Sequence, residues 1–186
     1  GVTGGSPAIL RAGIAVLIAA FNEEKVILNT IISVMQSSYQ SGLEIVVVDD
    51  GSTDHTADIV QTAANADGRI KLVRQPNFGK SRALDRALRE SHHEHIVMLD
   101  ADTHFLPDTV AKLVAPLSDP AVGAVSGHVR VGNAQASWIT RLQELEYSCG
   151  FNLDRRAYDV WNCITVVPGA ISAFRRSVIE AAGGIS

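Results

Sequence analysis

The chain alternates between short apolar runs and longer amphipathic stretches. Four apolar runs rich in β-branched residues predict strands, at Ile14–Ala20, Glu44–Val48, Ile70–Val73 and His95–Leu99. Three stretches between them predict helices, at Glu23–Gln36, Thr53–Ala66 and Lys80–Ser91. Because runs such as IVVV and IVML are apolar at consecutive positions, these strands are expected to be covered on both faces. The pattern predicts an α/β fold with a mainly parallel central sheet flanked by helices.

The second half of the chain departs from this alternation. Ala121–Val131 predicts a strand, Ser137–Leu153 a long helix, and Ile164–Phe174 extended chain around a Pro-Gly pair. The long helix carries one apolar stripe, for which core packing is favoured over contact with a partner or membrane. The expected architecture is therefore α/β with an irregular C-terminal part.

Composition narrows the possible classes of protein. The chain has 186 residues, of which 46% are hydrophobic and 19% charged, as expected for one soluble globular unit. Its formal net charge of −4 leaves no broad basic face, so nucleic acid is not an expected partner. The two cysteines, Cys149 and Cys163, lack the spacing of metal ligands and favour a reducing compartment. The longest apolar run, Ile14–Phe21, is far shorter than the roughly 20 residues that cross a bilayer.

Acidic residues follow two of the predicted strands. Polar segments come after all four strands, in AAFNEE, DDGSTD, QPNFGKS and DADT, and the carboxyl ends of parallel strands meet at one sheet edge. Asp49 and Asp50 follow the second strand, and Asp100 and Asp102 follow the fourth. Like charges at one edge repel unless a cation or bound donors offset them. Carboxylates suit Mg²⁺ or Mn²⁺, which usually complete their shell with substrate phosphates and water. The pattern predicts a metal site for a diphosphate ligand.

Other residues at this edge have structural alternatives. Asp54 and Asp108 could serve only as helix caps or turn formers. Lys80, after a flexible glycine, could meet the negative charge of the ligand or be an ordinary exposed lysine at a helix start. Phe21 could stack on a nucleobase, although a place in the core is the more common role of phenylalanine.

Three further motifs do not support a site. His92, His93 and His95 crowd the end of a predicted helix without any other ligand pattern, so a solvated helix terminus is favoured over a metal site. The GKS triplet lacks a glycine five residues before its Gly-Lys pair, where Arg74 stands, so it is no P-loop. No G-x-G-x-x-G follows the first strand, which argues against a dinucleotide-binding domain.

The ordered set AAFNEE, VVVDDGSTD, NFGKSRAL, VMLDADT and PGAISAFRRS resembles glycosyltransferase family 2. Within that family the chain is similar to the catalytic domains of processive polysaccharide synthases, which make poly-N-acetylglucosamine, chitin oligosaccharide, hyaluronan or cellulose. The likeness covers about Ile14 to Ser186. It implies a GT-A fold, with residues 1–13 as a leader and residues 14–186 as an incomplete catalytic domain.

The resemblance also implies roles for particular residues. Phe21 would lie against uracil, Asp49 or Asp50 would hydrogen-bond the base, and Lys80 would lie near the nucleotide. Asp100 would approach the ribose or the metal, and Asp102 would hold Mg²⁺ or Mn²⁺ on the diphosphate. The full implied set contacting the nucleotide sugar is Ala20, Phe21, Asn22, Glu23, Asp49, Asp50, Lys80, Asp100 and Ala101, with Asp100 and Asp102 as metal ligands. The chain departs from the family at Ala19 and Ala20, where relatives commonly carry a proline.

The activity implied by the resemblance is metal-dependent, inverting transfer of a sugar from a UDP-sugar, with UDP-GlcNAc favoured, to a glycan acceptor. The general base would be an Asp in a Thr-Glu-Asp element beyond Ser186, so no catalytic base is expected in this chain. The chain is therefore expected to be soluble and to bind the donor, with little or no transfer. The parent enzyme is expected at the cytoplasmic face of the cell membrane, anchored by segments outside this chain.

Two other functions stay open from the sequence. VMLDADT matches the D-x-D-x-T nucleophile motif of haloacid-dehalogenase-like phosphatases, and IVVVDD matches their later acidic pair. In those phosphatases the nucleophile motif comes first, whereas here Asp49 and Asp50 precede Asp100. A non-catalytic nucleotide-binding module would keep the same acidic residues.

Overall fold

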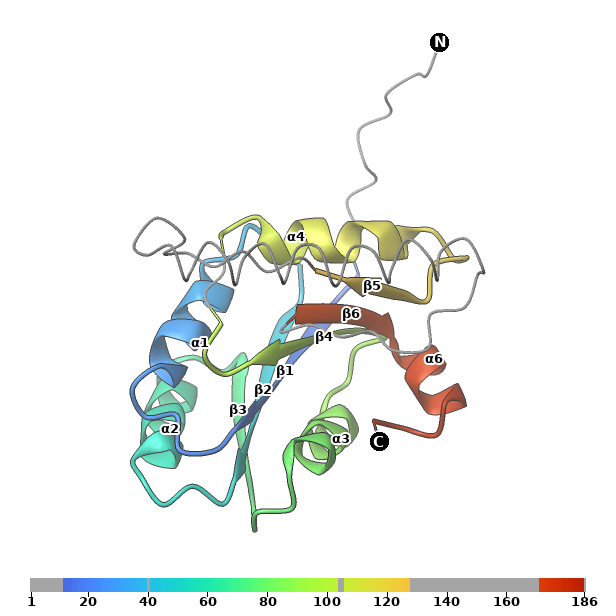
Figure 1. The fold of residues 1–186 in the computed structure, drawn as a ribbon. Helices are drawn as coiled ribbons and strands as arrows, with labels where there is room; N and C mark the ends of the chain where they lie inside the picture. The colour runs from blue at the N-terminus through green and yellow to red at the C-terminus, as the bar shows by residue number, and fades with distance from the viewer. Residues whose placement is uncertain (1–11, 40, 104–105, 128–170, 186) are drawn as a thin grey trace, which may run out of the picture. The chain divides into compact units, whose positions relative to one another are not determined.

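A computed structural model describes residues 12–39, 41–103, 106–127 and 171–185. These residues form a six-stranded sheet in the order β3-β2-β1-β4-β6-β5 (Figure 1). The strands are β1 (Ile14–Ala20), β2 (Leu43–Asp50), β3 (Ile70–Gln75), β4 (His95–Asp100), β5 (Ala124–Ser126) and β6 (Ile171–Arg175). Strands β1 to β4 are mutually parallel, whereas β6 runs antiparallel to both β4 and β5. The prediction of a mainly parallel sheet is therefore confirmed.

The helices follow the predicted alternation, with later starts for two of them. They are α1 (Ile27–Met35), α2 (Thr56–Ala66), α3 (Lys80–Glu90), α4 (Thr109–Val114) and α6 (Arg176–Ala181), with a short 3₁₀ helix at Ala115–Ser118. Helices α1 and α2 begin four and three residues later than predicted. The residues before each helix instead form hydrogen bonds between the two segments. No helix in the described ranges is long and apolar enough to cross a membrane.

The predictions for the second half are only partly tested. Of the predicted strand Ala121–Val131, residues Ala124–Ser126 form β5, and residues 128–131 lie outside the described residues. The predicted extended segment Ile164–Phe174 overlaps β6 from Ile171 onward. The predicted helix Ser137–Leu153 lies wholly outside the described residues.

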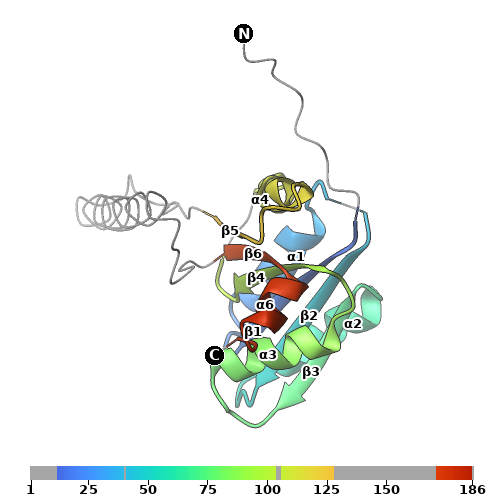
Figure 2. The same ribbon diagram turned by 90° about the vertical axis from the view of Figure 1, so that its right-hand side faces the viewer.

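Helices cover both faces of the parallel strands, which explains why these strands are apolar at consecutive positions. Helix α3 lies against one face of β1 and β2, and α1 and α2 lie on the opposite side of the sheet (Figures 1 and 2). The core under α3 contains alternate strand residues together with one stripe of the helix: Ala15, Leu17, Val46, Val48, Ala83, Leu84, Ala87 and Leu88. The intervening strand residues, such as Val16 and Val47, are fully buried on the other face.

The topology creates a crevice at the carboxyl ends of β1 and β4. The chain leaves β1 through α1 toward β2 on one side of the sheet, and it reaches β4 through α3 on the other side. Because consecutive connections diverge here, their loops leave space between them at the strand ends. This is where α/β sheets of this kind bind ligands.

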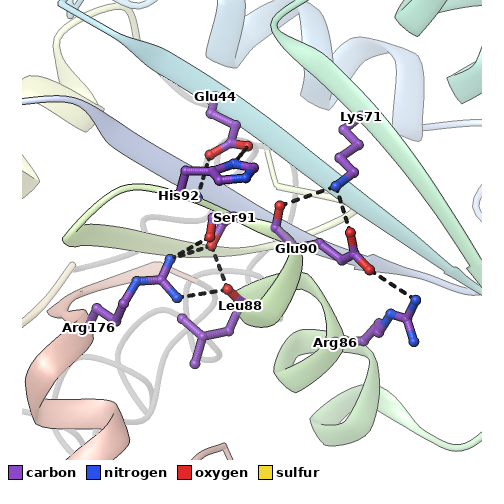
Figure 3. Close-up of polar contacts among 8 residues, drawn as sticks. All are labelled: Glu44, Lys71, Arg86, Leu88, Glu90, Ser91, His92 and Arg176. Atoms are coloured by element: carbon purple, nitrogen blue, oxygen red, sulfur yellow. Dashed lines mark hydrogen bonds and ion pairs between the residues drawn. The ribbon is translucent and has the colours of Figure 1, made fainter.

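Arg176, at the start of α6, fixes the connection from α3 to β4 (Figure 3). Its guanidinium donates to the carbonyl oxygens of Leu88, Ser91 and His93 at 2.9, 3.0 and 3.0 Å, and to Ser91 Oγ at 2.7 Å. The last carbonyls of a helix have no donor within the helix. Arg176 therefore supplies donors to the carboxyl end of α3 and to the turn that leads into β4.

Ion pairs tie the same end of α3 to the sheet (Figure 3). Lys71 Nζ on β3 contacts Glu90 Oε2 at 2.6 Å, and Arg86 contacts the other oxygen of Glu90 at 2.9 Å. His92 donates its backbone N–H to Glu44 on β2 at 3.0 Å. With Arg176, these contacts hold the carboxyl end of α3 against the sheet.

Candidate functional site: a charged pocket at the carboxyl ends of β1, β2 and β4

A cavity of about 270 Å³ opens at this crevice. Its lining comes from the ends of three parallel strands and the start of α3: Ala19, Ala20, Phe21, Glu23, Asp50, Lys80, Asp100, Ala101 and Asp102. All of the predicted donor and metal residues except Asn22 and Asp49 line this cavity. The structure thus brings the predicted residues together, while their roles toward a ligand stay predictions.

The two acids of the D-x-D segment differ in their surroundings. Asp100 is the last residue of β4, and its carboxylate forms an ion pair with Lys80 Nζ. Asp102 is exposed and makes no hydrogen bond or ion pair with another described residue. One carboxylate is therefore held in place by a cation of the protein, and the other is free to take a ligand.

Glu23 is a fourth acidic residue in the lining of the cavity, with Asp50, Asp100 and Asp102. Burial raises the pKa of Glu23, and the negative charges of Asp102, Asp54 and Asp100 raise it further. Glu23, Asp100 and Asp102 line the same cavity, where their negative charges repel one another. Repulsion of this kind favours a bound cation. No group of three or more His, Cys, Asp or Glu side chains in the described ranges is arranged to hold a metal by itself. A cation here would take ligands from the substrate as well as from Asp100 and Asp102.

Asp50 organises the loop that leads into α3. Its carboxylate accepts hydrogen bonds from Gln75 Nε2 at 2.7 Å and from the backbone N–H groups of Phe78 and Gly79 at 2.9 and 2.8 Å. The side chain is nearly fully buried, so these three donors offset the cost of removing the carboxylate from water. Asp50 thereby fixes the residue before Lys80 as well as lining the cavity.

Asp49 faces away from the cavity. It is buried, accepts a hydrogen bond from the backbone N–H of Ser52 at 3.2 Å, and lies 3.7 Å from Arg74 Nε. Adjacent strand residues point to opposite faces, so only one member of this acidic pair can line the cavity. The sequence left open which of the two it was, and the structure places Asp50 there.

Asn22 also lies outside the cavity lining, where it joins two of the loops. Its backbone N–H donates to Ser52 Oγ at 2.9 Å, and its side-chain oxygen accepts from the backbone N–H of Thr53 at 2.8 Å. The next residue continues the contact, since the N–H of Glu23 donates to Thr56 Oγ1 at 2.8 Å. Asn22 adopts a positive φ of 57°, which asparagine tolerates better than most residues. These bonds set the loop that carries Phe21 and Glu23.

The structure decides between the alternative roles considered for Phe21, Asp54 and Asp108. Phe21 is 45% exposed and lines the cavity, so the core alternative was wrong. Asp54 is not the cap residue of α2, but it accepts hydrogen bonds from the N–H and Oγ1 of Thr56 at 3.0 and 2.5 Å, as a turn former does. Asp108 precedes α4 without capping it through its side chain, and it pairs with Lys112.

The predicted histidine cluster divides into residues in different surroundings, and not all of them lie at a solvated helix terminus. His92 is exposed at the end of α3, where its ring lies 3.1 Å from Glu44. His95 is instead the first residue of β4, and its side chain is buried. For His95 the favoured interpretation was therefore wrong, because the strand begins at that residue.

Sequence reasoning missed Ala19 as a lining residue and did not foresee the donors that hold Asp50. Ala19 directly precedes Ala20 in the same motif, so its position alone could have placed it there. The N–H groups of Phe78 and Gly79 are backbone atoms, and no sequence signal identifies their partner.

The fold and the site together define the class of protein. A mainly parallel sheet in the order 3-2-1-4, with an acidic D-x-D segment after β4 and a lysine from α3 at the switch point, is the GT-A arrangement of nucleotide-sugar transferases. The chain belongs to glycosyl transferase family 2, whose family model matches residues 15–183.

Individual relatives agree with this assignment. The N-acetylglucosaminyltransferase of Rhizobium leguminosarum bv. viciae is 35% identical over 167 residues, covering 88% of this chain and 39% of that protein. The poly-beta-1,6-N-acetyl-D-glucosamine synthase of Staphylococcus aureus strain COL is 28% identical over 172 residues, covering 92% of this chain and 41% of that protein. The chain thus spans about two fifths of the length of these curated relatives.

A solved structure supports the fold. Mannosyltransferase PcManGT from Pyrobaculum calidifontis, in complex with GDP-Man and Mn²⁺, matches with a TM-score of 0.70 and 29% identity, over 94% of this chain and 47% of that chain. The expected GT-A fold is confirmed. Family membership also sets aside the haloacid-dehalogenase-like phosphatase.

Proposed function

We propose that this chain forms the donor-binding part of a metal-dependent, inverting glycosyltransferase that transfers N-acetylglucosamine from UDP-GlcNAc to a hydroxyl group of a glycan. The observation that carries the proposal is the convergence of Asp50, Lys80, Asp100 and Asp102 on one cavity at the switch point. The names of the relatives from Rhizobium and Staphylococcus support N-acetylglucosamine as the sugar.

The carboxylates of Asp100 and Asp102 fit a divalent cation. Asp102 has no partner among the described residues, and the nearby charges of Glu23 and Asp100 favour a positive ligand. Two carboxylate ligands suit Mg²⁺ or Mn²⁺, and the PcManGT structure contains Mn²⁺. When bound, the ion would stabilise negative charge on the departing diphosphate.

The protein's own residues would bind and orient the nucleotide. The exposed ring of Phe21 offers a face for the uracil base, and the Lys80 ammonium lies beside Asp100, where it can approach the diphosphate. Asp50 would act partly through the loop that it holds, because three of its hydrogen bonds go to residues 75–79. PcManGT binds GDP-Man, so uracil and guanine are the two bases to be compared.

Inverting transfer requires the acceptor hydroxyl to attack the anomeric carbon from the side opposite the nucleotide, with a general base taking its proton. We assign that base to the parent enzyme outside this chain. The likeness to a poly-beta-1,6-N-acetyl-D-glucosamine synthase supports a glycan acceptor. We further propose that the parent works at the cytoplasmic face of the cell membrane.

Calorimetric titration tests the donor proposal. UDP, GDP, UDP-GlcNAc and UDP-glucose are titrated with and without Mn²⁺ into the chain, into Asp102→Asn, and into Asp58→Asn. Asp58 is an exposed acid of α2 outside the cavity, so its variant is the matched control. We expect UDP-selective binding that Mn²⁺ strengthens and that only Asp102→Asn weakens, by about tenfold or more. Equal binding with and without Mn²⁺ in all three proteins would refute the proposal.

A further inference from the structure

The segment that follows α6 turns back onto α3 (Figures 1 and 2). Two stretches that are far apart in the sequence therefore meet, SRALDRAL in α3 and the Gly-Gly pair after α6. Asp85 and Ile185, which contact each other there, are 100 residues apart. The proposed function assigns a role to Lys80 of α3 but none to this contact.

Two glycines form the turn after α6. The N–H groups of Gly183 and Gly184 donate to the carbonyl oxygens of Glu180 and Ile179 at 3.1 and 3.0 Å, so they satisfy carbonyls at the end of the helix. Both glycines have a positive φ, of 90° and 105°, which costs glycine little. Ile185 then packs against the core under α3. The turn thus directs the chain toward α3.

Asp85 is the residue of α3 that receives this turn. Its Oδ1 accepts the backbone N–H of Ile185 at 3.4 Å, and its Oδ2 forms an ion pair with Arg89. The same Oδ1 lies close to Gly184, where a Cβ atom would be only 2.9 Å from it. A Cβ atom on Gly183 would have no atom within 4 Å. A side chain therefore fits at position 184 only if Asp85 moves, whereas position 183 has space for one.

The turn also lies beside the lysine of the donor pocket. A cavity of about 550 Å³ is lined by Gly183 and Ile185 of the turn and by Lys80 and Asp85 of α3. Lys80 lines the donor pocket as well, whereas Asp85 is not among the residues that line that pocket. Asp85 can therefore influence the reaction only through the residues that it holds.

We propose that Asp85 is a positioning residue for sugar transfer. By accepting the N–H of Ile185 and lying against Gly184, it fixes the direction in which the chain leaves α6 beside Lys80. The inference rests on the proposed function, because the expected general base follows Ser186 in the parent enzyme and would be placed by this turn. Loss of Asp85 should then lower the rate of transfer without changing the affinity for the donor.

Amide hydrogen exchange tests the contact in the chain itself. The exchange rate of the Ile185 N–H is measured by nuclear magnetic resonance in the chain and in Asp85→Ala, Asp85→Asn and Asp58→Ala. Asp58 is an exposed acid of α2 and serves as the control. We expect Asp85→Ala to raise this rate about fivefold, as the loss of one hydrogen bond would. Asp85→Asn should stay close to the original rate, because its amide oxygen still accepts.

The amides of β1 show whether a variant loosens the whole fold. A rise in their exchange equal to the rise at Ile185 would assign Asp85 to overall stability alone and overturn the inference. An unchanged rate at Ile185 in Asp85→Ala would overturn it as well.

The two glycines provide a second test of the same contact. Alanine at either position is strained at positive φ, but only Gly184→Ala brings a Cβ atom against Asp85. We therefore expect the effect of Gly184→Ala on Ile185 exchange to be about threefold smaller in the Asp85→Ala background. The effect of Gly183→Ala should be the same in both backgrounds. Equal behaviour of the two glycine variants would contradict the contact.

The parent enzyme with the same substitutions tests the effect on transfer. With UDP-GlcNAc and Mn²⁺, we expect Asp85→Ala to lower kcat about tenfold and to leave the KM for UDP-GlcNAc within about twofold. Asp85→Asn should restore most of kcat, and Asp58→Ala should have no effect. An unchanged kcat in Asp85→Ala, or a KM that rises as much as kcat falls, overturns the inference. If the unmodified parent transfers no sugar from UDP-GlcNAc, the proposed function fails and the role in transfer fails with it, while the exchange rates still decide whether Asp85 holds the turn.

Discussion

The carboxylate of Asp50 accepts the backbone N–H of Gly79 at 2.8 Å, so the end of β2 holds the residue that precedes Lys80. In Asp50→Asn, an amide N–H₂ group replaces one carboxylate oxygen. This group cannot accept a hydrogen bond from the donor that it faces. We expect a loss of about 1–3 kcal/mol in the free energy of unfolding and weaker UDP binding, because the loop before α3 is no longer fixed. Urea denaturation and calorimetry measure the two effects.

Gln75→Leu is a milder variant with which Asp50→Asn is compared. It removes one donor to Asp50 and leaves the bonds from Phe78 and Gly79. We expect a smaller loss, of about 1 kcal/mol, with UDP binding retained. If Gln75→Leu were as damaging to UDP binding as Asp50→Asn, the backbone bonds would not be what positions Lys80.

Lys80 competes with any cation for Asp100, because its ammonium forms an ion pair with that carboxylate. In Lys80→Met the side chain keeps its length and loses its charge. We expect Mn²⁺ alone to bind a few times more tightly, since Asp100 is released, and UDP to bind about tenfold more weakly. Free Mn²⁺ is followed by electron paramagnetic resonance, and UDP by calorimetry.

Lys71→Met is the control for the loss of charge, because Lys71 pairs with Glu90 at the opposite end of α3. Neither Mn²⁺ nor UDP binding should change in this variant. A parallel weakening of Mn²⁺ and UDP binding in Lys80→Met would show that Lys80 helps to form the metal site and does not compete with it.

The parallel core was predictable from the sequence because its signal is local. The bounds of β1 match the prediction Ile14–Ala20, since an apolar run buried on both faces ends where polar residues begin. The acidic residues then fell at one edge because parallel strands share their carboxyl ends. The place of Asp100 and Asp102, and of one member of the pair Asp49 and Asp50, followed from these two facts.

The remaining features depend on contacts between distant segments. Helix α1 begins at Ile27 and not at Glu23, and the N–H of Glu23 bonds instead to the side chain of Thr56 at the start of α2. The choice between Asp49 and Asp50 depends on which face of β2 lies under the loop before α3. No periodicity in the sequence encodes such pairings.

The loss of Arg176 should destabilise the fold without affecting the site directly. Its guanidinium donates four hydrogen bonds to the end of α3 and the following turn. We expect Arg176→Ala to reduce the free energy of unfolding by about 2–4 kcal/mol, because several part-buried carbonyl groups lose their donor. Urea denaturation measures the loss, and UDP binding by the folded fraction should be unchanged.

Arg89→Ala is the matched control for Arg176. Arg89 is an exposed arginine of α3, the helix that Arg176 contacts, and its partner is Asp85 one turn earlier. Surface pairs of this kind contribute roughly 0.3–0.5 kcal/mol. Similar losses in both variants would show that the hydrogen bonds of Arg176 add little to stability.

His95 should make the stability of the fold depend on pH. Burial lowers the pKa of His95, the positive charge of Arg175 lowers it further, and neither ring nitrogen has a partner among the described residues. The neutral form is therefore favoured in the folded state. Stability is fully present above the ordinary pKa of 6.5 and falls as the pH is lowered toward the folded value, because the unfolded chain binds more protons there.

His95→Leu should reduce this fall between about pH 6.5 and 5. At pH 7.5 the variant should be as stable as the original chain or slightly more stable, since it buries no unsatisfied ring nitrogen. Thermal melts across the pH range measure the difference. His55→Leu, at an exposed position, should keep the original pH dependence. An unchanged fall in His95→Leu would contradict the assignment.

Asn22 contributes to the site through its backbone conformation and through its side chain, and two variants separate these contributions. Asn22→Gly keeps the positive φ of 57° accessible but removes the acceptor of the Thr53 N–H, whereas Asn22→Ala loses both. We expect Asn22→Ala to be about 1 kcal/mol less stable than Asn22→Gly, because alanine is strained at positive φ. Both should weaken UDP binding, since the loop that carries Phe21 loses one of its bonds to the segment after β2. If Asn22→Gly bound UDP as well as the original chain, the side-chain bond would be dispensable, and the backbone conformation alone would place Phe21.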